Sequence, residues 1–235
     1  MIDALCHLDL CDDPTRATTE AARVGVSALV CAGVDPRTDL ALPSLPGVHR
    51  AYGIHPQAAC DADLEEQLAT LARRLDEPGV VALGECGLDG RAGMPPIDAQ
   101  ERALRAQLVL AVERNLPIIV HVVRAHPRAL ALIEGSAVRR GVWHAFAGPR
   151  EAIAPAVRLG LFLSVGGLIL RANARKLREA VPHIPADRLL VETDAPDLAP
   201  GRLVDVVAEV ARLRGDGAAQ VAGLTAANAR AAYQL

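Results

Sequence analysis

The chain has 235 residues, a formal net charge of −3 and a single lysine, Lys176. No cluster of basic residues is visible, so the charge distribution does not support tight, sequence-independent DNA binding. It is compatible with a small site that binds a phosphate through a metal. Of the residues, 51% are hydrophobic but only 2% are aromatic; this argues against an aromatic-lined binding platform and predicts a core of Ala, Val and Leu.

Eight short apolar runs, taken in chain order, predict β-strands. Most of them are near-continuous rather than alternating, as expected for parallel strands that are covered on both faces. The runs are IDALCHL (2–8), SALVCAG (27–33), HRAYGIH (49–55), VVALGE (80–85), IIVHVV (118–123), GVWHAF (141–146), LFLSVGG (161–167) and LLVETD (189–194).

Longer segments with apolar residues three and four positions apart predict amphipathic helices between the strands. They are 61–77, 96–115, 173–184, 203–215 and a terminal pair of helices in 217–224 and 225–235. Alternating strands and helices over this length predict an α/β fold, a single-domain (β/α)8 TIM barrel spanning residues 1–235. A doubly wound open sheet is the alternative, although no GxGxxG follows the first strand.

The cysteine count is odd and no CxxC occurs among the five cysteines, which is typical of a reduced cytoplasmic protein. The N-terminus does not read as a signal peptide. No stretch approaches the roughly 20 apolar residues of a spanning helix. We therefore expect a soluble, cytoplasmic protein with no membrane partner.

Six of the predicted strands end in a side chain that can bind a metal or exchange a proton. These side chains are His7, His55, Glu85, His121, His144 and Asp194. Taken singly, each has a structural explanation, such as a core histidine for His121 or a turn cap for Asp194. The carboxyl ends of barrel strands meet at one mouth, however, and several buried ionisable groups need a shared partner. Imidazole and carboxylate ligands suit a divalent cation such as Zn²⁺ or Mn²⁺.

In its ordered set of segments the chain resembles the TatD-like metal-dependent hydrolases, (β/α)8 barrels of the wider amidohydrolase group. The segments are MIDALCHLDL, AGVDP, AYGIHP, ALGECGLD, LPIIVH, GVWHAFAG, LGLFLSVGG, RLLVETDAP and LTAANARAAY. The resemblance implies two metal positions and hydrolysis of phosphodiester bonds, which for some members makes the protein a deoxyribonuclease.

The resemblance also implies which residues hold the metals. Glu85, His121 and His144 would hold the second ion, and His7 and Asp194, with Glu85 as bridge, would hold the first. The family has an HxH pair on its first strand, whereas this chain has Leu5 in place of the earlier histidine. We therefore expect one tight ion (Zn, Mn or Mg) and a weak or absent second ion, because even an outer-shell loss costs about 10–100-fold in metal affinity.

The same resemblance assigns further roles. Asp194 and Glu85 are the predicted catalytic residues, with Asp194 taking a proton from the attacking water. His55 and Arg124 are the predicted substrate-binding residues. The chain departs from the family in the short DLAPGRLVD loop (197–205) after the last strand, which removes family contacts to substrate.

Three functions remain open from the sequence. The first is a phosphodiesterase acting on DNA or on a small phosphodiester, and the second is a one-metal hydrolase of a small ester, amide or lactone. The third is a catalytically weak or inactive barrel that binds a metabolite, nucleic acid or partner. The intact set of Glu85, His121, His144 and Asp194 favours an enzyme, whereas Leu5 favours the third function. The sequence does not indicate an oligomeric state.

Overall fold

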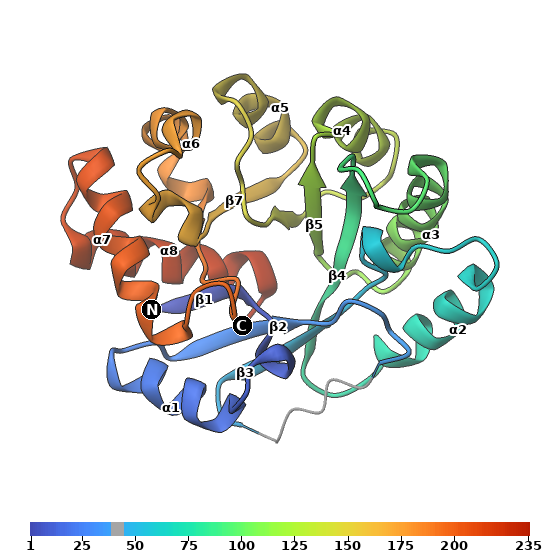
Figure 1. Cartoon of the computed structure of the whole chain (residues 1–235), viewed down its shortest axis with the longest axis horizontal. Coiled ribbons are helices and arrows are strands. Elements are labelled where there is room, and N and C mark those ends of the chain that lie inside the picture. The colour runs from blue at the N-terminus through green and yellow to red at the C-terminus, as the bar shows by residue number, and fades with distance from the viewer. Residues whose placement is uncertain (39–44) are drawn as a thin grey trace.

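A computed structural model describes residues 1–38 and 45–235. Eight parallel strands form one sheet in the order β1 to β8, and helices surround it (Figure 1), which confirms the predicted (β/α)8 barrel. The strands are β1 (Ile2–Cys6), β2 (Ala28–Ala32), β3 (Val48–Tyr52), β4 (Val80–Asp89), β5 (Ile118–Val123), β6 (Gly141–Trp143), β7 (Leu161–Val165) and β8 (Leu189–Val191). The helices are α1 (Pro14–Arg23), α2 (Leu64–Arg74), α3 (Ile97–Glu113), α4 (His126–Glu134), α5 (Ile153–Arg158), α6 (Arg175–Ala180), α7 (Leu203–Arg214) and α8 (Ala218–Tyr233).

The first and last strands meet at a seam made by backbone hydrogen bonds just beyond their ends. The Asp194 N–H donates to the Leu5 carbonyl at 3.1 Å, and the His7 N–H donates to the Ala195 carbonyl at 2.8 Å. These bonds bring the two edges of the sheet together. They also place His7 and Asp194, predicted from opposite ends of the chain, beside each other.

The strand residues divide between two apolar clusters, as expected for strands covered on both faces. One cluster joins Cys6, Leu83 and Trp143 to helix residues such as Leu104 and packs between the strands and the helix layer. The other gathers small and aliphatic residues from the opposite face of the strands and closes against α8. It contains Ala4, Leu5, Val30, Ala32, Ala51, Ala82, Ile119 and Val142. These residues fill the barrel interior, as in other barrels of this type.

The ends of several strands differ from the predicted ones. β4 continues to Asp89, beyond the predicted end at Glu85. β1, β6 and β8 end earlier than predicted, so His7, His144 and Asp194 begin the loops that follow these strands. Asp194 has a positive φ of 54°, a conformation outside the strand region.

The predicted terminal pair of helices is wrong, because residues 218–233 form the single helix α8. Gly223 lies within it on an exposed turn, and an interior glycine costs a helix only about 1 kcal/mol. Three other helices, α1, α4 and α5, lack a long apolar stripe and begin at or near a proline or are very short. Their formation follows from packing on the sheet more than from sequence periodicity.

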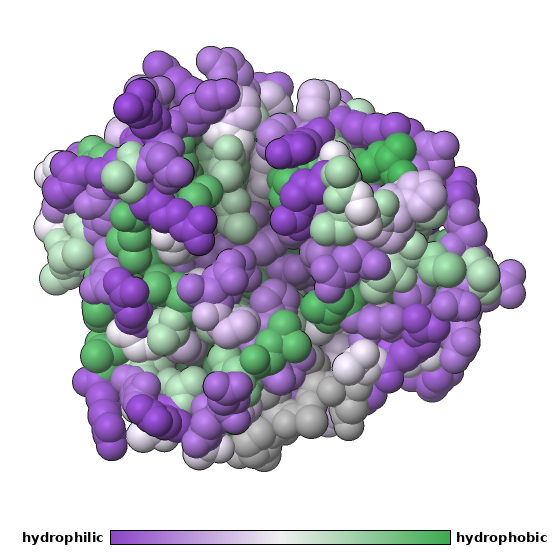
Figure 2. Space-filling model, in the orientation of Figure 1, coloured by the Kyte–Doolittle hydropathy of each residue, from purple (hydrophilic) through white to green (hydrophobic). Residues whose placement is uncertain are grey.

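The surface shown in Figure 2 is mainly hydrophilic over the helices, with hydrophobic residues in scattered patches. Within the described residues, none of the helices is both long and apolar enough to pass through a bilayer.

A buried carboxyl reinforces the seam. Asp3 is fully buried, and its Oδ1 accepts a hydrogen bond of 2.9 Å from the Thr193 N–H while its Oδ2 accepts one of 2.5 Å from the Thr193 hydroxyl. Burial raises the pKa of Asp3 to about 8 despite the bonds from Thr193, which lower it. Asp3 therefore faces the seam and not the ligand cluster at the barrel mouth.

We expect the pH dependence of stability to change in an Asp3→Asn variant. The pKa of Asp3 is higher in the folded chain than its ordinary value of 3.8, so its contribution is fully present below that value and is lost as pH rises towards 8. The free energy of unfolding of the wild type should therefore fall relative to the variant between pH 4 and pH 8, measured by urea denaturation. Parallel curves for the two proteins would show that Asp3 does not titrate in this range.

Candidate metal centre

Six ionisable side chains meet where the strands of the barrel end. Glu85 lies within β4 and His121 within β5, whereas the other four stand just after their strands. All six are buried or half-buried, and they are His7, His55, Glu85, His121, His144 and Asp194. The structure thus brings together five residues predicted as metal ligands, and it adds His55, predicted as a substrate contact, to the same cluster.

The first group of possible metal ligands is His7, Glu85 and Asp194, whose ligand atoms lie within 4.8 Å of one another. His7 Nε2 is 3.7 Å from Glu85 Oε1 and 3.5 Å from Asp194 Oδ1. The other ring nitrogen, Nδ1, is 2.8 Å from the Ala32 carbonyl. A hydrogen bond from Nδ1–H to this carbonyl orients the ring so that Nε2 faces the two carboxylates.

The second group is His55, Glu85 and His121. His55 Nε2 lies 3.5 Å from Glu85 Oε2, and the Gln57 N–H donates to His55 Nδ1 at 3.1 Å. The rings of His55 and His121 meet edge to face, with their centroids 4.5 Å apart. Glu85 therefore contributes one carboxylate oxygen to each side of the centre.

His144 lies between the members of this centre. Its Nε2 is 3.0 Å from Glu85 Oε1 and 3.2 Å from His121 Nδ1. Its Nδ1 is 3.4 Å from Oε1 of Glu192, a fully buried carboxylate whose Oε1 also accepts a hydrogen bond from the Ala145 N–H at 2.5 Å. A carboxylate behind a histidine orients the ring and raises its basicity, as behind metal-bound histidines.

The histidines of the cluster differ in pKa because their charged neighbours differ. Burial lowers the pKa of His7, but Glu85 and Asp194 outweigh it and raise that pKa to about 10. Burial lowers the pKa of His55 to about 4, and the neighbouring histidines add to this effect. Burial opposes ionisation of Glu85, yet His144 and His7 hold the pKa of that carboxyl well below its usual range. Glu85 is therefore an anion at the centre of four imidazoles.

The donor set fits a divalent cation. Imidazole nitrogens and carboxylate oxygens are the ligands of Zn²⁺ and similar ions. The Glu85 Oε1 atom is buried and has no hydrogen-bond partner among the described residues, although His144 Nε2 is close to it. Imidazole nitrogens of His121 and His144 also face each other across 3.2 Å. A cation bound between these groups would satisfy the lone pairs that point inward.

Leu5 lies at the level of this centre, because its carbonyl accepts the hydrogen bond from the Asp194 N–H. Its side chain is fully buried in the apolar cluster of the barrel interior, whereas Cys6 packs on the helix side of the strand. The wall beneath His7 and Asp194 is thus hydrocarbon.

Arg124 lies outside the centre. It is exposed, it follows β5 with a positive φ of 54°, and it is not among the residues that surround Glu85. A contact between Arg124 and substrate stays a prediction.

Two acidic residues of the centre were missing from the sequence-based set. Glu192 is two positions before Asp194, and Asp89 is four positions after Glu85 on the extended β4. Asp89 Oδ2 lies 3.1 Å from His121 Nε2 and also pairs with the Arg91 guanidinium. The two-residue spacing of Glu192 and Asp194 in the predicted strand 189–194 was the available signal for Glu192, whereas Asp89 lies beyond the predicted end of its strand at Glu85.

The fold and the centre define a TIM barrel with candidate metal ligands at the carboxyl ends of its strands. Residues 2–234 match the family model described as TatD related DNase. The chain is 35% identical over 245 residues to the 3'-5' ssDNA/RNA exonuclease TatD of Erwinia tasmaniensis, covering 95% of this chain and 94% of that protein. It is 33% identical over 246 residues to the protein of the same name from Escherichia fergusonii, with the same coverages. The chain belongs to the TatD-related DNase family.

Solved structures agree with this assignment. The TatD homolog YJJV of Escherichia coli K12 superposes with a TM-score of 0.91 at 30% identity, covering 100% of this chain and 98% of that one. A TatD family hydrolase of Entamoeba histolytica gives a TM-score of 0.84 at 18% identity, with coverages of 99% and 97%, and supports the fold alone.

Replacing Glu192 should weaken metal binding without unfolding the chain. A Glu192→Gln variant keeps the size of the side chain and a hydrogen-bond acceptor for the Ala145 N–H, but it removes the charge behind His144. We expect the Kd for Zn²⁺ to rise about 10–100-fold, measured by titration against a competing chelator. The exposed Glu65 on α2 provides the matched control, Glu65→Gln. Equal Zn²⁺ affinity in the two variants would show that Glu192 does not support the centre.

Proposed function

We propose that this protein is a metal-dependent phosphodiesterase of the TatD deoxyribonuclease type that acts on single-stranded nucleic acid. The observation that carries the proposal is the convergence of two groups of possible metal ligands on one shared carboxylate, Glu85. Centres in which a carboxylate joins two metal positions are a recurrent device for phosphodiester hydrolysis. The names of the relatives, 3'-5' ssDNA/RNA exonucleases, supply the substrate class.

The residues take distinct roles in this proposal. His55, Glu85 and His121 hold a divalent ion, with His144 completing that side, and His7 and Asp194 form the other side with Glu85. When bound, such an ion supplies Lewis acidity, which polarises a phosphoryl oxygen and makes a nearby water a stronger acid. The geometry favours a ligand role for His55 over the substrate contact expected from the sequence, because its Nε2 points at Glu85.

Asp194 is the proposed general base. Burial opposes ionisation of Asp194, but His7, whose Nε2 lies 3.5 Å from Asp194 Oδ1, outweighs burial and lowers the pKa of the carboxyl. Asp194 is therefore an anion. It also lies at the rim of the cluster, only half-buried, while Glu85 is buried. A carboxylate in this position can accept the proton of the water that attacks the phosphodiester.

The activity assay tests the proposal directly. Release of nucleotides from single-stranded DNA with Mg²⁺, Mn²⁺ or Zn²⁺ should be lowered about 100–10,000-fold in Asp194→Asn, the usual contribution of a general base. The same proteins assayed on p-nitrophenyl acetate and on bis(p-nitrophenyl) phosphate separate an esterase from a phosphodiesterase. Asp194-dependent cleavage of the acetate ester alone would favour the small-ester hydrolase, and no turnover of any substrate would favour the binding protein.

Leu5 limits the first metal position in this proposal. With hydrocarbon in place of an imidazole beside His7, the group His7, Glu85 and Asp194 has only three ligand side chains, one of them shared. We infer that the chain binds one ion tightly and a second ion weakly or not at all.

A Leu5→His variant should therefore gain a second tight ion and a higher phosphodiesterase rate. Metal content measured by mass spectrometry after gel filtration should rise from about one to about two ions per chain. Leu5→Gln is the matched control, because it places a polar group of similar size at the same point without an imidazole. Two tight ions in the wild type, or one ion in Leu5→His, would contradict the inferred role of Leu5.

A further inference from the structure

A cavity of about 420 Å³ opens beside the metal centre. It lies between the loops that follow β6, β7 and β8, and Asp194 is part of both the cavity wall and the centre. Its apolar lining is Phe146, Leu168, Leu170, Leu177 and Leu198. Its remaining charged lining is Arg171, Asp197 and Arg202. The cavity thus joins apolar walls to a few charged groups, as ligand pockets do.

Gly167 lets the loops around the cavity approach closely, and the neighbouring Gly166 is in ordinary contact distance of Glu192. A Cβ on Gly167 would lie 3.2 Å from Leu198 Cβ, and a Cβ on Gly166 would lie 3.4 Å from Glu192 Oε1. The loop after β7 therefore packs directly on the residues that follow β8. This contact fixes the cavity wall relative to Asp194 and to the carboxylate that supports His144.

Two side chains at the rim of the cavity, Leu168 and Arg171, are exposed to solvent. Leu168 is 39% exposed, although its neighbours Ile169 and Leu170 are buried or half-buried. Arg171 is exposed and has no carboxylate partner in the described part of the chain, whereas Arg202 is held by Asp205 at 2.8 Å. An apolar surface and a free guanidinium thus stand together at the entrance.

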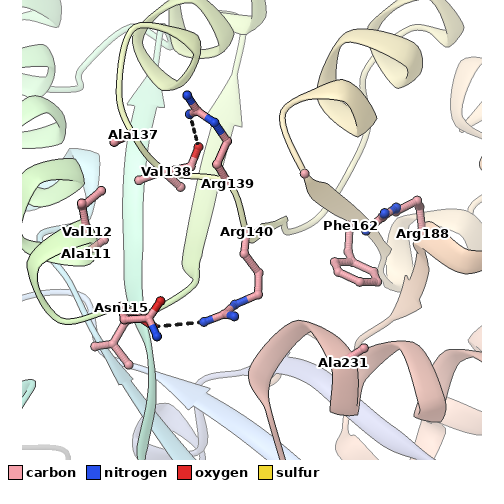
Figure 3. A pocket seen from close by; sticks show the side chains of 12 residues that line it. Ala111, Val112, Asn115, Ala137, Val138, Arg139, Arg140, Phe162, Arg188 and Ala231 are labelled. Atoms are coloured by element: carbon pink, nitrogen blue, oxygen red, sulfur yellow. Dashed lines mark hydrogen bonds between the residues drawn. The ribbon is translucent and has the colours of Figure 1, made fainter.

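A second cavity, of about 480 Å³, is also lined by arginines, but these contact other parts of the protein (Figure 3). It lies at the opposite end of the barrel, where the strands begin. Arg140 donates to the Asn115 carbonyl after α3, and Arg139 donates to the Ser136 and Val138 carbonyls after α4. The third arginine, Arg188, covers the Phe162 ring at 5.0 Å. These contacts hold the three arginines against the fold, although Arg140 Nε is buried without a hydrogen-bond partner among the described residues, so the second cavity differs from the cavity beside Asp194.

We propose that the cavity beside Asp194 binds the nucleoside unit next to the scissile phosphate, with Arg171 contacting the phosphate of that unit and Leu168 contacting its base. The proposal rests on the proposed function. In TIM barrels the loops after strands 7 and 8 frequently form a phosphate site, and a base is bound through its flat face with little dependence on sequence. Asp197 is placed to accept a hydrogen bond from the sugar or the base.

The first test measures binding of thymidine 5'-monophosphate by calorimetry in EDTA, which keeps the metal out of the measurement. Arg171→Ala should weaken binding about tenfold, the effect of losing one hydrogen bond to a charged group. Leu168→Ser should weaken binding of the nucleotide but leave the affinity for inorganic phosphate unchanged. The matched control is Arg158→Ala, which removes an exposed arginine at the end of α5, at the opposite end of the barrel.

The second test compares kcat/KM on an oligothymidylate with kcat/KM on bis(p-nitrophenyl) phosphate, which has no nucleoside. Arg171→Ala should lower the ratio of the two values about tenfold, and Arg158→Ala should not change it. If the wild type cleaves both substrates and Arg171→Ala gives the same ratio as Arg158→Ala, the proposed subsite is wrong while the proposed function stands. If the wild type cleaves neither substrate with Mg²⁺, Mn²⁺ or Zn²⁺, the proposed function fails and the subsite fails with it.

Discussion

Closure of the sheet between β1 and β8 is the constraint on which the centre depends. Two backbone hydrogen bonds, Asp194 to Leu5 and His7 to Ala195, bridge the edges of the sheet. In an open sheet these residues would lie on opposite borders, and Glu85 would meet only part of the ligand set. The same seam holds Asp3 against Thr193. The stability of the seam and the geometry of the candidate site therefore rely on neighbouring backbone groups.

Glu85 is the second point on which the arrangement converges. It is buried, yet it lies within 3.7 Å of His7, 3.5 Å of His55 and 3.0 Å of His144. Desolvating a carboxylate is costly unless charges or donors compensate it. Here the surrounding imidazoles compensate it, and the supporting carboxylates Asp89 and Glu192 stand behind two of those imidazoles. In the centre, imidazoles therefore surround the Glu85 carboxylate, and further carboxylates lie behind two of these imidazoles.

The sequence predicted the strands, the barrel and the gathering of polar side chains at its mouth, because continuous apolar runs and residues at strand ends are local features. It did not reveal that α8 is continuous or that His55 points at Glu85, since packing decides both. Glu192 was also missed, because its role depends on a contact between the residue after β6 and the end of β8. The family resemblance places a histidine where this chain has Leu5, and in the structure the Leu5 side chain is buried among apolar residues.

The seam also has a consequence for how the chain acquires its site during synthesis. Asp3 and Thr193, which bond across it, are 190 residues apart in the chain, and α8 then closes over β1 through the Tyr233 hydroxyl and the Ala4 carbonyl at 2.7 Å. A nascent chain still lacking its last strand has the earlier histidines and Glu85 but neither Asp194 nor the backbone groups that fix His7. The emerging polypeptide is thus without a complete centre until β8 and the residues that follow it have been made.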